Sequence, residues 1–164
     1  MLFKNVARYT SSKMPLTDET ITQCVNYIKN TISISYETDI VIDPCAVTGD
    51  LIKALDKLVK FSFYYHLNPS HTDIQPVDFR LVDFPKFDKT ILSGLWYDSV
   101  HIISCPAEAE AANFLEKCSE YADSISFIMP AKGEPCFHLP NYALLLTAEI
   151  NETYSLKIWR RKTG

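Results

Sequence analysis

Residues with the chemistry of a ligand site follow the β-branched apolar run at 40–42. An acid, Asp43, ends this run, and a turn that reaches Gly49 comes directly after it. Residues 51–59 then carry apolar side chains at helical spacing, which predicts a strand, a tight turn and a helix. Because ligands of open α/β sheets bind beyond the carboxyl ends of the strands, Asp43 and Gly49 are candidate binding residues. An ordinary strand–turn–helix unit with nothing bound fits the same spacing.

A second kind of chemistry is that of a cysteine nucleophile. Cys105 lies at the end of another apolar run, and a thiolate needs a base within hydrogen-bond reach. His101 and His66 are the candidate bases. Residues 101 and 105 straddle the end of the predicted strand, so their spacing does not imply contact. A cysteine-dependent enzyme is therefore kept as one hypothesis among three.

Composition limits the function classes. The 164 residues carry a net charge of −4 and 47% apolar residues, which exclude a disordered chain and disfavour a large nucleic-acid footprint. Five cysteines, none at C-x-x-C spacing, and the lack of a recognisable signal peptide predict reduced thiols in an intracellular setting. Four scattered histidines predict no metal site. No apolar run reaches the ~20 residues of a membrane helix.

The elements that must position these residues alternate along the chain. We expect a helix capped by Thr17 that ends near Ile32, and a short edge strand around 78–82. The remaining expected elements are strands at 39–43, 61–67, 99–103 and 124–129, helices at 49–60 and 108–121, and a hairpin of 142–150 with 153–159. This order predicts an α/β fold, a three-layer, mostly parallel sheet with helices on both faces and a C-terminal antiparallel hairpin. We expect a single domain over 1–164, with residues 1–15 as an N-terminal arm.

This order of elements resembles the class I S-adenosylmethionine-dependent methyltransferase fold, a Rossmann-like fold. The motifs look most like those of short adenine-N6-type DNA methyltransferases of large DNA viruses. Residues 124–130 are similar to that family's fifth strand, and 156–159 to its final strand. The resemblance implies S-adenosylmethionine as cofactor. It also implies a set of cofactor-binding positions: Tyr9, Thr10, Asp43, Gly49, Asp78 and Phe79.

Three departures from the family pattern bear on activity. Val47 replaces the first glycine of the turn, although glycine lets the backbone approach a ligand closely. The end of the second strand, residues 65–69, lacks the acid that holds the ribose in the family. The family's catalytic Asn/Asp-Pro-Pro-Tyr/Phe motif is replaced by Ser104-Cys105-Pro106-Ala107-Glu108, in which Cys105 stands where the amide should orient the target amine.

These departures lead to our main hypothesis, a degenerate, catalytically inactive methyltransferase-like protein that acts as a binding or structural subunit. We expect it to bind a protein partner or a larger, possibly viral, assembly and no cofactor, with Ser104, Cys105 and Pro106 as a vestigial motif. Trp96 is the expected partner anchor, because tryptophan is enriched at binding hot spots. The alternative is an active S-adenosylmethionine-dependent enzyme with a non-adenine substrate, in which Glu108 or His101 serves as base.

Overall fold

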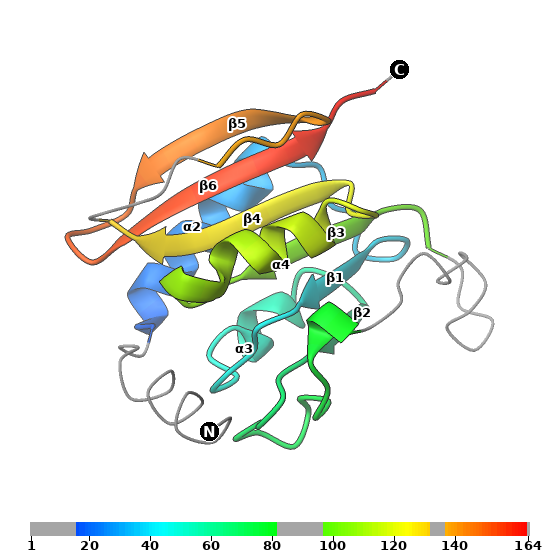
Figure 1. Ribbon diagram of the computed structural model, residues 1–164, viewed down its shortest axis with the longest axis vertical. Helices are drawn as coiled ribbons and strands as arrows, with labels where there is room; N and C mark the ends of the chain where they lie inside the picture. The colour runs from blue at the N-terminus through cyan, green and yellow to red at the C-terminus, as the bar shows by residue number, and fades with distance from the viewer. Residues whose placement is uncertain (1–15, 82–96, 132–136, 164) are drawn as a thin grey trace.

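The strands of this chain form one six-stranded sheet, seen in the computed structural model of residues 16–81, 97–131 and 137–163 (Figure 1). Its strands are β1 (Ile40–Asp43), β2 (Phe61–Tyr64), β3 (Val100–Ser104), β4 (Ser124–Pro130), β5 (Tyr142–Glu149) and β6 (Tyr154–Arg161). Their order in the sheet is β2-β1-β3-β4-β6-β5. The pairs among β2, β1, β3 and β4 are parallel, whereas β6 is antiparallel to both β4 and β5.

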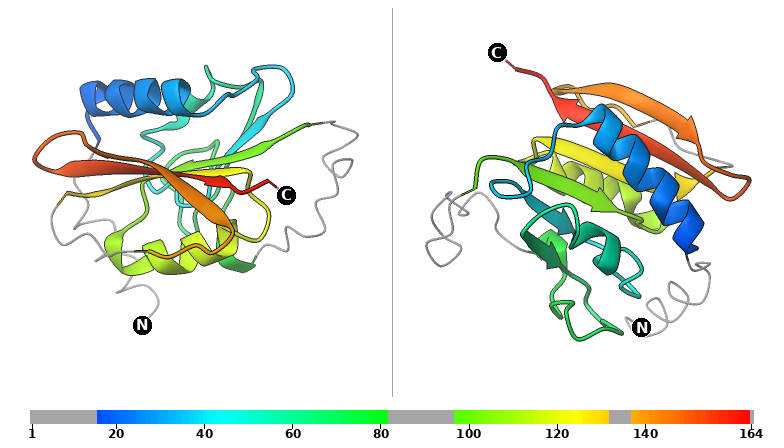
Figure 2. Two further views of the ribbon diagram at one scale, coloured as in Figure 1. Left: turned by 90° about the horizontal axis from the view of Figure 1, so that it is seen from above. Right: turned by 180° about the vertical axis from the view of Figure 1, so that it is seen from behind.

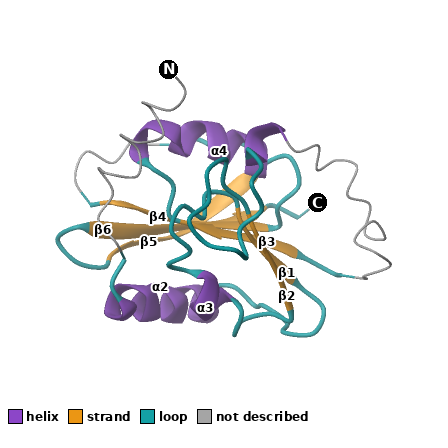
Figure 3. Cartoon of the chain, turned by 90° about the horizontal axis from the view of Figure 1, so that it is seen from below, coloured by secondary structure: helices purple, strands orange, loops and turns teal. Residues whose placement is uncertain are grey.

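Helices cover both faces of this sheet, as Figures 2 and 3 show. Helices α2 (Asp18–Thr31) and α3 (Ile52–Leu55) lie on one face, and α4 (Ala111–Cys118) lies on the other. Helix α2 begins where the sequence predicts, because the Thr17 hydroxyl accepts a hydrogen bond from the Thr20 N–H. The predicted fold class, a three-layer, mostly parallel sheet with a C-terminal antiparallel hairpin, is confirmed.

The central strands are buried on both faces, since each face packs against its own apolar cluster. All five residues of β3 are buried, as are the first six of β4. On the α4 side the cluster includes Phe127 and Trp159, and on the α2 side it includes Leu156 and Ile158. This double burial is why the residues of β3 and β4 that face either side of the sheet are mostly apolar in the sequence.

A buried polar network joins three strands at the amino end of the sheet. The His101 ring lies 2.8 Å through Nε2 from Asp39 Oδ2 and 2.7 Å through Nδ1 from Ser124 Oγ. Asp39 also accepts the Ser35 N–H at 3.0 Å. All three side chains of the network are less than a tenth exposed. His101 therefore fastens the start of β3 to β1 and β4.

Several expected elements differ from the structure. The helix expected at 49–60 is a single turn, α3, because turns flank it on both sides. The buried strand expected at 61–67 ends at Tyr64, and Phe61 is exposed.

Residues 79–81 form a 3-10 turn, η1, where we expected an edge strand, because Asp78 turns the chain through its bond to the Arg80 N–H. The helix expected at 108–121 is a 3-10 turn, η3 (Glu108–Glu110), followed by the shorter α4. The expected arm at 1–15 and Trp96 lie outside the described residues.

Candidate functional site

Asp43 holds the turn after β1 by bonds within the chain. Its Oδ1 accepts the Cys45 N–H at 3.2 Å and the Ser104 hydroxyl at 2.5 Å. The bond to Ser104 joins the carboxyl ends of the neighbouring strands β1 and β3 across 61 residues of sequence. Asp43 is 2% exposed and Ser104 is fully buried. The predicted ligand-binding acid is therefore a buried link between two strands.

Gly49 takes a backbone conformation that favours glycine, with a φ of +77°. A Cβ placed there would lie 2.9 Å from Ile52 Cδ1 and 3.3 Å from two side-chain carbons of His71. The loop after β2 thus lies directly against the turn after β1. A second contact holds it there, since the Ser70 hydroxyl donates to the Val47 carbonyl at 3.1 Å. Both contacts cover the part of the turn that the family resemblance assigns to the cofactor.

The depression beside this turn is small. Its lining residues are Leu16, Asp43, 45–51 and Cys105, and its volume is about 10 Å³. A single water molecule needs roughly 10–15 Å³ measured in this way. Val47 is among the lining residues and is itself 4% exposed, so its methyl groups are packed into the core on the α4 side. The space among these described residues admits about one water molecule.

Two residues of the expected catalytic motif, Cys105 and Pro106, are buried in the protein. Cys105 is 4% exposed and packs in the apolar cluster on the α2 side, and Pro106 is buried. Burial raises the pKa of the neighbouring Cys24 thiol to about 12, and the nearby Cys105 adds to this rise. A buried thiol in such surroundings is a poor nucleophile.

The structure does not bring His101, one of the two expected bases, to Cys105. His101 lies at the amino end of β3, bonded to Asp39 and Ser124, whereas Cys105 follows the carboxyl end of the same strand. His66 is buried beyond the end of β2, where its Nδ1 accepts the Asn68 N–H at 3.0 Å. The hypothesis of a Cys105–His101 pair is therefore wrong. His101 is equally misplaced as a base for methyl transfer, because it is buried at the opposite end of the sheet from the crevice.

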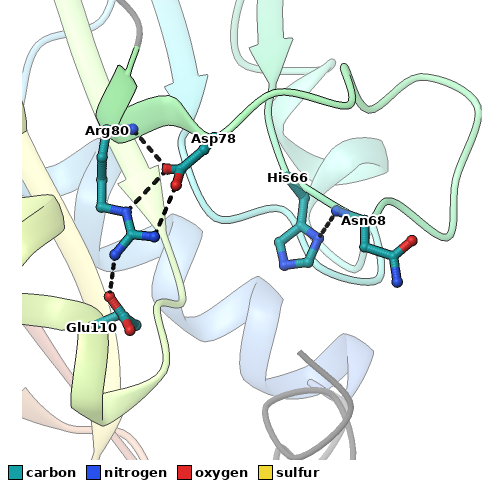
Figure 4. A network of polar contacts seen from close by, with 5 residues as sticks. All are labelled: His66, Asn68, Asp78, Arg80 and Glu110. Carbon is teal, nitrogen blue, oxygen red and sulfur yellow. Dashed lines mark hydrogen bonds and ion pairs between the residues drawn. The ribbon is translucent and has the colours of Figure 1, made fainter. Parts of the chain in front are cut away.

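Asp78 is bonded to a neighbouring arginine, as Figure 4 shows. Its two carboxylate oxygens accept Arg80 Nε at 3.0 Å and Arg80 Nη2 at 2.8 Å. Arg80 Nη1 in turn donates to Glu110 at 2.6 Å and its guanidinium stacks on the Phe114 ring, with 5.6 Å to the centroid. The hydrogen bonds from Arg80 lower the pKa of Asp78, and His66 nearby adds to the effect.

Phe79, the partner of Asp78 in the expected motif, is a core residue. It is 1% exposed, and its ring centroid lies 5.6 Å from that of Tyr65 and 6.1 Å from that of Tyr121. Of the expected cofactor positions, Asp43 ends β1, Gly49 lies in the turn after it, and Asp78 and Phe79 lie at the 3-10 turn η1. Tyr9 and Thr10 lie outside the described residues.

Two residues that contact these positions were missed in the sequence. Arg80 stands two residues after Asp78, and an Asp-x-Arg pair in a turn is a recognisable ion pair. For Ser104 the sequence predicts only a place in the vestigial motif, because its bond to Asp43 depends on the β1–β3 register.

The described residues form neither a metal-binding cluster nor a membrane-spanning helix. Among 16–81, 97–131 and 137–163, no three His, Cys, Asp or Glu side chains come close enough together to ligate a metal ion. Within the same ranges, no helix has the length and apolar character needed to cross a membrane.

Comparison with known proteins supports the fold. No protein-family model matches the chain, and no curated protein sequence matches it significantly. The solved structures that resemble it include the 23S rRNA methyltransferase ErmE, with a TM-score of 0.62 and 10% identity over 93% of this chain and 71% of that one. An rRNA methylase from Streptococcus thermophilus has a TM-score of 0.58 and 11% identity over 92% and 98% of the two chains. At such low identity these likenesses establish the fold, and the chain has the methyltransferase Rossmann-like fold.

Proposed function

We propose that this chain is a methyltransferase-like protein that transfers no methyl group and acts as a binding or structural subunit. The observation that carries the proposal concerns the two acids that were expected to bind the cofactor. Both accept hydrogen bonds from residues of the chain itself. Asp43 is bonded to Ser104, and Asp78 is bonded to Arg80. The buried Asp43 carboxylate in particular loses its bonds when it turns to a ligand, which weakens binding.

The contacts around the turn after β1 support a chain that holds no S-adenosylmethionine. His71 lies against Gly49, and the depression beside Val47 holds about 10 Å³. S-adenosylmethionine needs a pocket of several hundred Å³. The end of β2 offers the ribose no carboxylate, because residues 65–68 are Tyr, His, Leu and Asn. We therefore derive no step of methyl transfer from this arrangement.

A protein partner fits this chain better than nucleic acid does. The net charge of −4 disfavours a large basic face of the kind that neutralises phosphates. The proposal includes an ancestry among adenine-N6 enzymes and a place in a viral assembly. Both rest only on the positions of the sequence motifs. An intracellular location remains a prediction from the cysteine pattern.

Calorimetric titration with S-adenosylmethionine and with S-adenosylhomocysteine tests the proposal. We expect no saturable heat for either compound up to millimolar ligand. The matched variant is Arg80→Ala, which releases Asp78 while leaving the buried core untouched. Wild-type binding in the micromolar range that is lost in Asp78→Asn would overturn the proposal, because it would place a working cofactor site at the acids.

One observation favours the alternative, an active methyltransferase with a non-adenine substrate. Gly49 keeps the left-handed backbone of a ligand-binding turn, and a side-chain hydrogen bond from Ser70 to the Val47 carbonyl joins the loop after β2 to it. Ser70→Ala would then favour an open turn. Transfer of labelled methyl groups to any fraction of a cell extract, increased by Ser70→Ala, would support this alternative. Glu108, at the start of η3, is the exposed acid that such an enzyme would have available.

A further inference from the structure

Strand β5 forms one edge of the sheet, and its composition is unusual for an edge. In the described residues it pairs only with β6, so no described strand pairs with its other side. Its sequence from Tyr142 to Glu149 contains no proline and no lysine, the residues that commonly block edge pairing. Leu144 and Leu145 are 50% and 36% exposed, and Leu145 lies at a bulge in the β5–β6 register.

The two ends of β5 carry opposite charges. Glu149 closes the strand at its carboxyl end, and Glu152 follows in the exposed hairpin turn. Beside its amino end lie two exposed cations, because Arg160 pairs with Ala143 and the Lys162 N–H donates to the Asn141 carbonyl. An antiparallel pair of identical strands brings each end against the opposite end of the other, so unlike charges meet at both ends.

A groove beside the acidic end adds to this complementarity. It lies between α2 and the end of β5 and has a volume of about 310 Å³. The lining residues are Gln23, Asn26, Tyr27, Asn30, Glu149 and Ile150. This lining contains a carboxylate and three amides but no cation, so it suits a cationic side chain.

Arg160 lies on the face of the sheet that could reach such a groove. It lies on the same face of β6 as Leu156 and Ile158, which pack on the α2 side, because every second residue of a strand shares a face. A twofold axis perpendicular to the sheet keeps the α2 sides of two copies on the same face. Two inter-strand spacings, about 10 Å, then separate the backbone of Glu149 from β6 of the second copy, within the combined reach of Glu and Arg side chains.

We propose that two copies of this chain associate through β5, pairing antiparallel about a twofold axis to form one continuous twelve-stranded sheet. Leu144 and Leu145 of the two copies cover each other at its centre. Arg160 of each copy faces the amide-lined groove that ends at Glu149 of the other copy. Arg161 takes no part, because it is bonded to the Ala122 carbonyl and the Tyr142 hydroxyl within its own copy. The inference does not rest on the proposed function, since an active enzyme could pair in the same way.

The solution mass of the full chain tests this pairing. Light scattering behind size exclusion, from about 1 to 200 µM protein, is expected to give twice the 18.7 kDa of one chain. Leu145→Lys places a charge in the centre of the edge and should weaken the dimer at least about tenfold. Leu67→Lys is the matched control, because Leu67 is a similarly exposed leucine in the loop after β2 and should leave the mass unchanged.

A charge exchange distinguishes this interface from any other. Glu149→Arg and Arg160→Glu should each weaken the dimer, and the two changes together should restore it, because unlike charges then meet again. Circular dichroism checks that each variant is folded. A monomer at every concentration would overturn the proposal. So would a dimer that Leu145→Lys and both single charge changes leave intact, because its interface would lie elsewhere.

Discussion

Strand β1 has a buried carboxylate at each end, and the two ends can be compared directly. At the amino end, Asp39 bonds to His101 of β3, which bonds in turn to Ser124 of β4. At the carboxyl end, Asp43 bonds to Ser104 of β3. In both places an acid of β1 is joined to a polar side chain of the neighbouring strand. The carboxyl end, where ligands of this fold class bind, is therefore held together in the same way as the structural end.

The two ends differ in what surrounds the bonded acids. The amino-end network is enclosed in the core, whereas the carboxyl end carries a second, more exposed network of Asp78, Arg80 and Glu110. A contact close to solvent can be exchanged for a ligand at small cost, whereas a buried one cannot. Any remaining ligand response of this chain should therefore involve Asp78 before Asp43.

The largest expected effect is at the amino end. Asp39→Ala removes the acceptor for His101 and for the Ser35 N–H in a buried site, so it should lower the free energy of unfolding by about 3 kcal/mol. Urea unfolding at pH 7 measures the change. Glu37→Ala is the control, because Glu37 is exposed and its ion pair with Lys60 spans 3.9 Å. A loss below about 1 kcal/mol for Asp39→Ala would show that the network does not hold the strands.

At the carboxyl end, Asp43→Ala should cost about 2 kcal/mol, because the Cys45 N–H and the Ser104 hydroxyl lose a buried acceptor. A double-mutant cycle with Ser104→Ala isolates the bond between them. We expect a coupling energy of about 1 kcal/mol from chemical unfolding of the four proteins. Additive effects of the two changes would show that Asp43 and Ser104 do not link β1 to β3, and the two ends of β1 would then not be held in the same way.

Gly49→Ala tests the packing of the loop after β2 on the turn. The positive φ and the short approach of the new Cβ to Ile52 should together cost about 1–2 kcal/mol. Thermal unfolding measures this loss, and Thr48→Ala, at an exposed neighbouring position, should change little. Equal melting temperatures for the two variants would mean that the loop does not rest on Gly49.

Ser126 of β4 lies between the two ends of the sheet and can be compared with the serines at both ends. Ser104 and Ser124 have partners at the two ends, whereas the fully buried Ser126 hydroxyl has no hydrogen-bond partner in the part of the chain that the structure describes. Ser126→Ala removes an unsatisfied polar group and should raise the free energy of unfolding by roughly 0.5–1 kcal/mol. Ser124→Ala, measured beside it, should lower that free energy. A destabilised Ser126→Ala would reveal a partner for this hydroxyl.

The smallest effect is expected at Asp78. Its bonds to Arg80 lower its pKa below 3.8, so they stabilise the fold above that pH and are lost as the pH falls through the lowered value. Asp78→Asn should cost about 0.5 kcal/mol at pH 7, and the difference from the wild type should shrink towards pH 3. Unfolding curves at both pH values check this. A difference that grows on acidification would assign the opposite sign to the contact.

The sequence by itself determined the order of the elements and the fold class. Thr17 fixed the start of α2, because an N-cap depends on residues within one helical turn. The apolar runs of β3 and β4, and the terminal hairpin, were equally readable because their patterns are local. Where the local pattern was weak, the prediction failed, as at residues 79–81, which bend where a strand was expected.

Only the tertiary structure decided how the candidate site residues are used. Asp43 and Gly49 were found by their positions after a strand, but Ser104 and His71 came to them through strand order and loop packing. The exposure of β5 was decided in the same way, because a hairpin has two strands and only the sheet order places β5 outermost. The physical reason is range: hydrogen bonding within a turn depends on a few neighbouring residues, whereas contacts across strands depend on the register of the whole sheet.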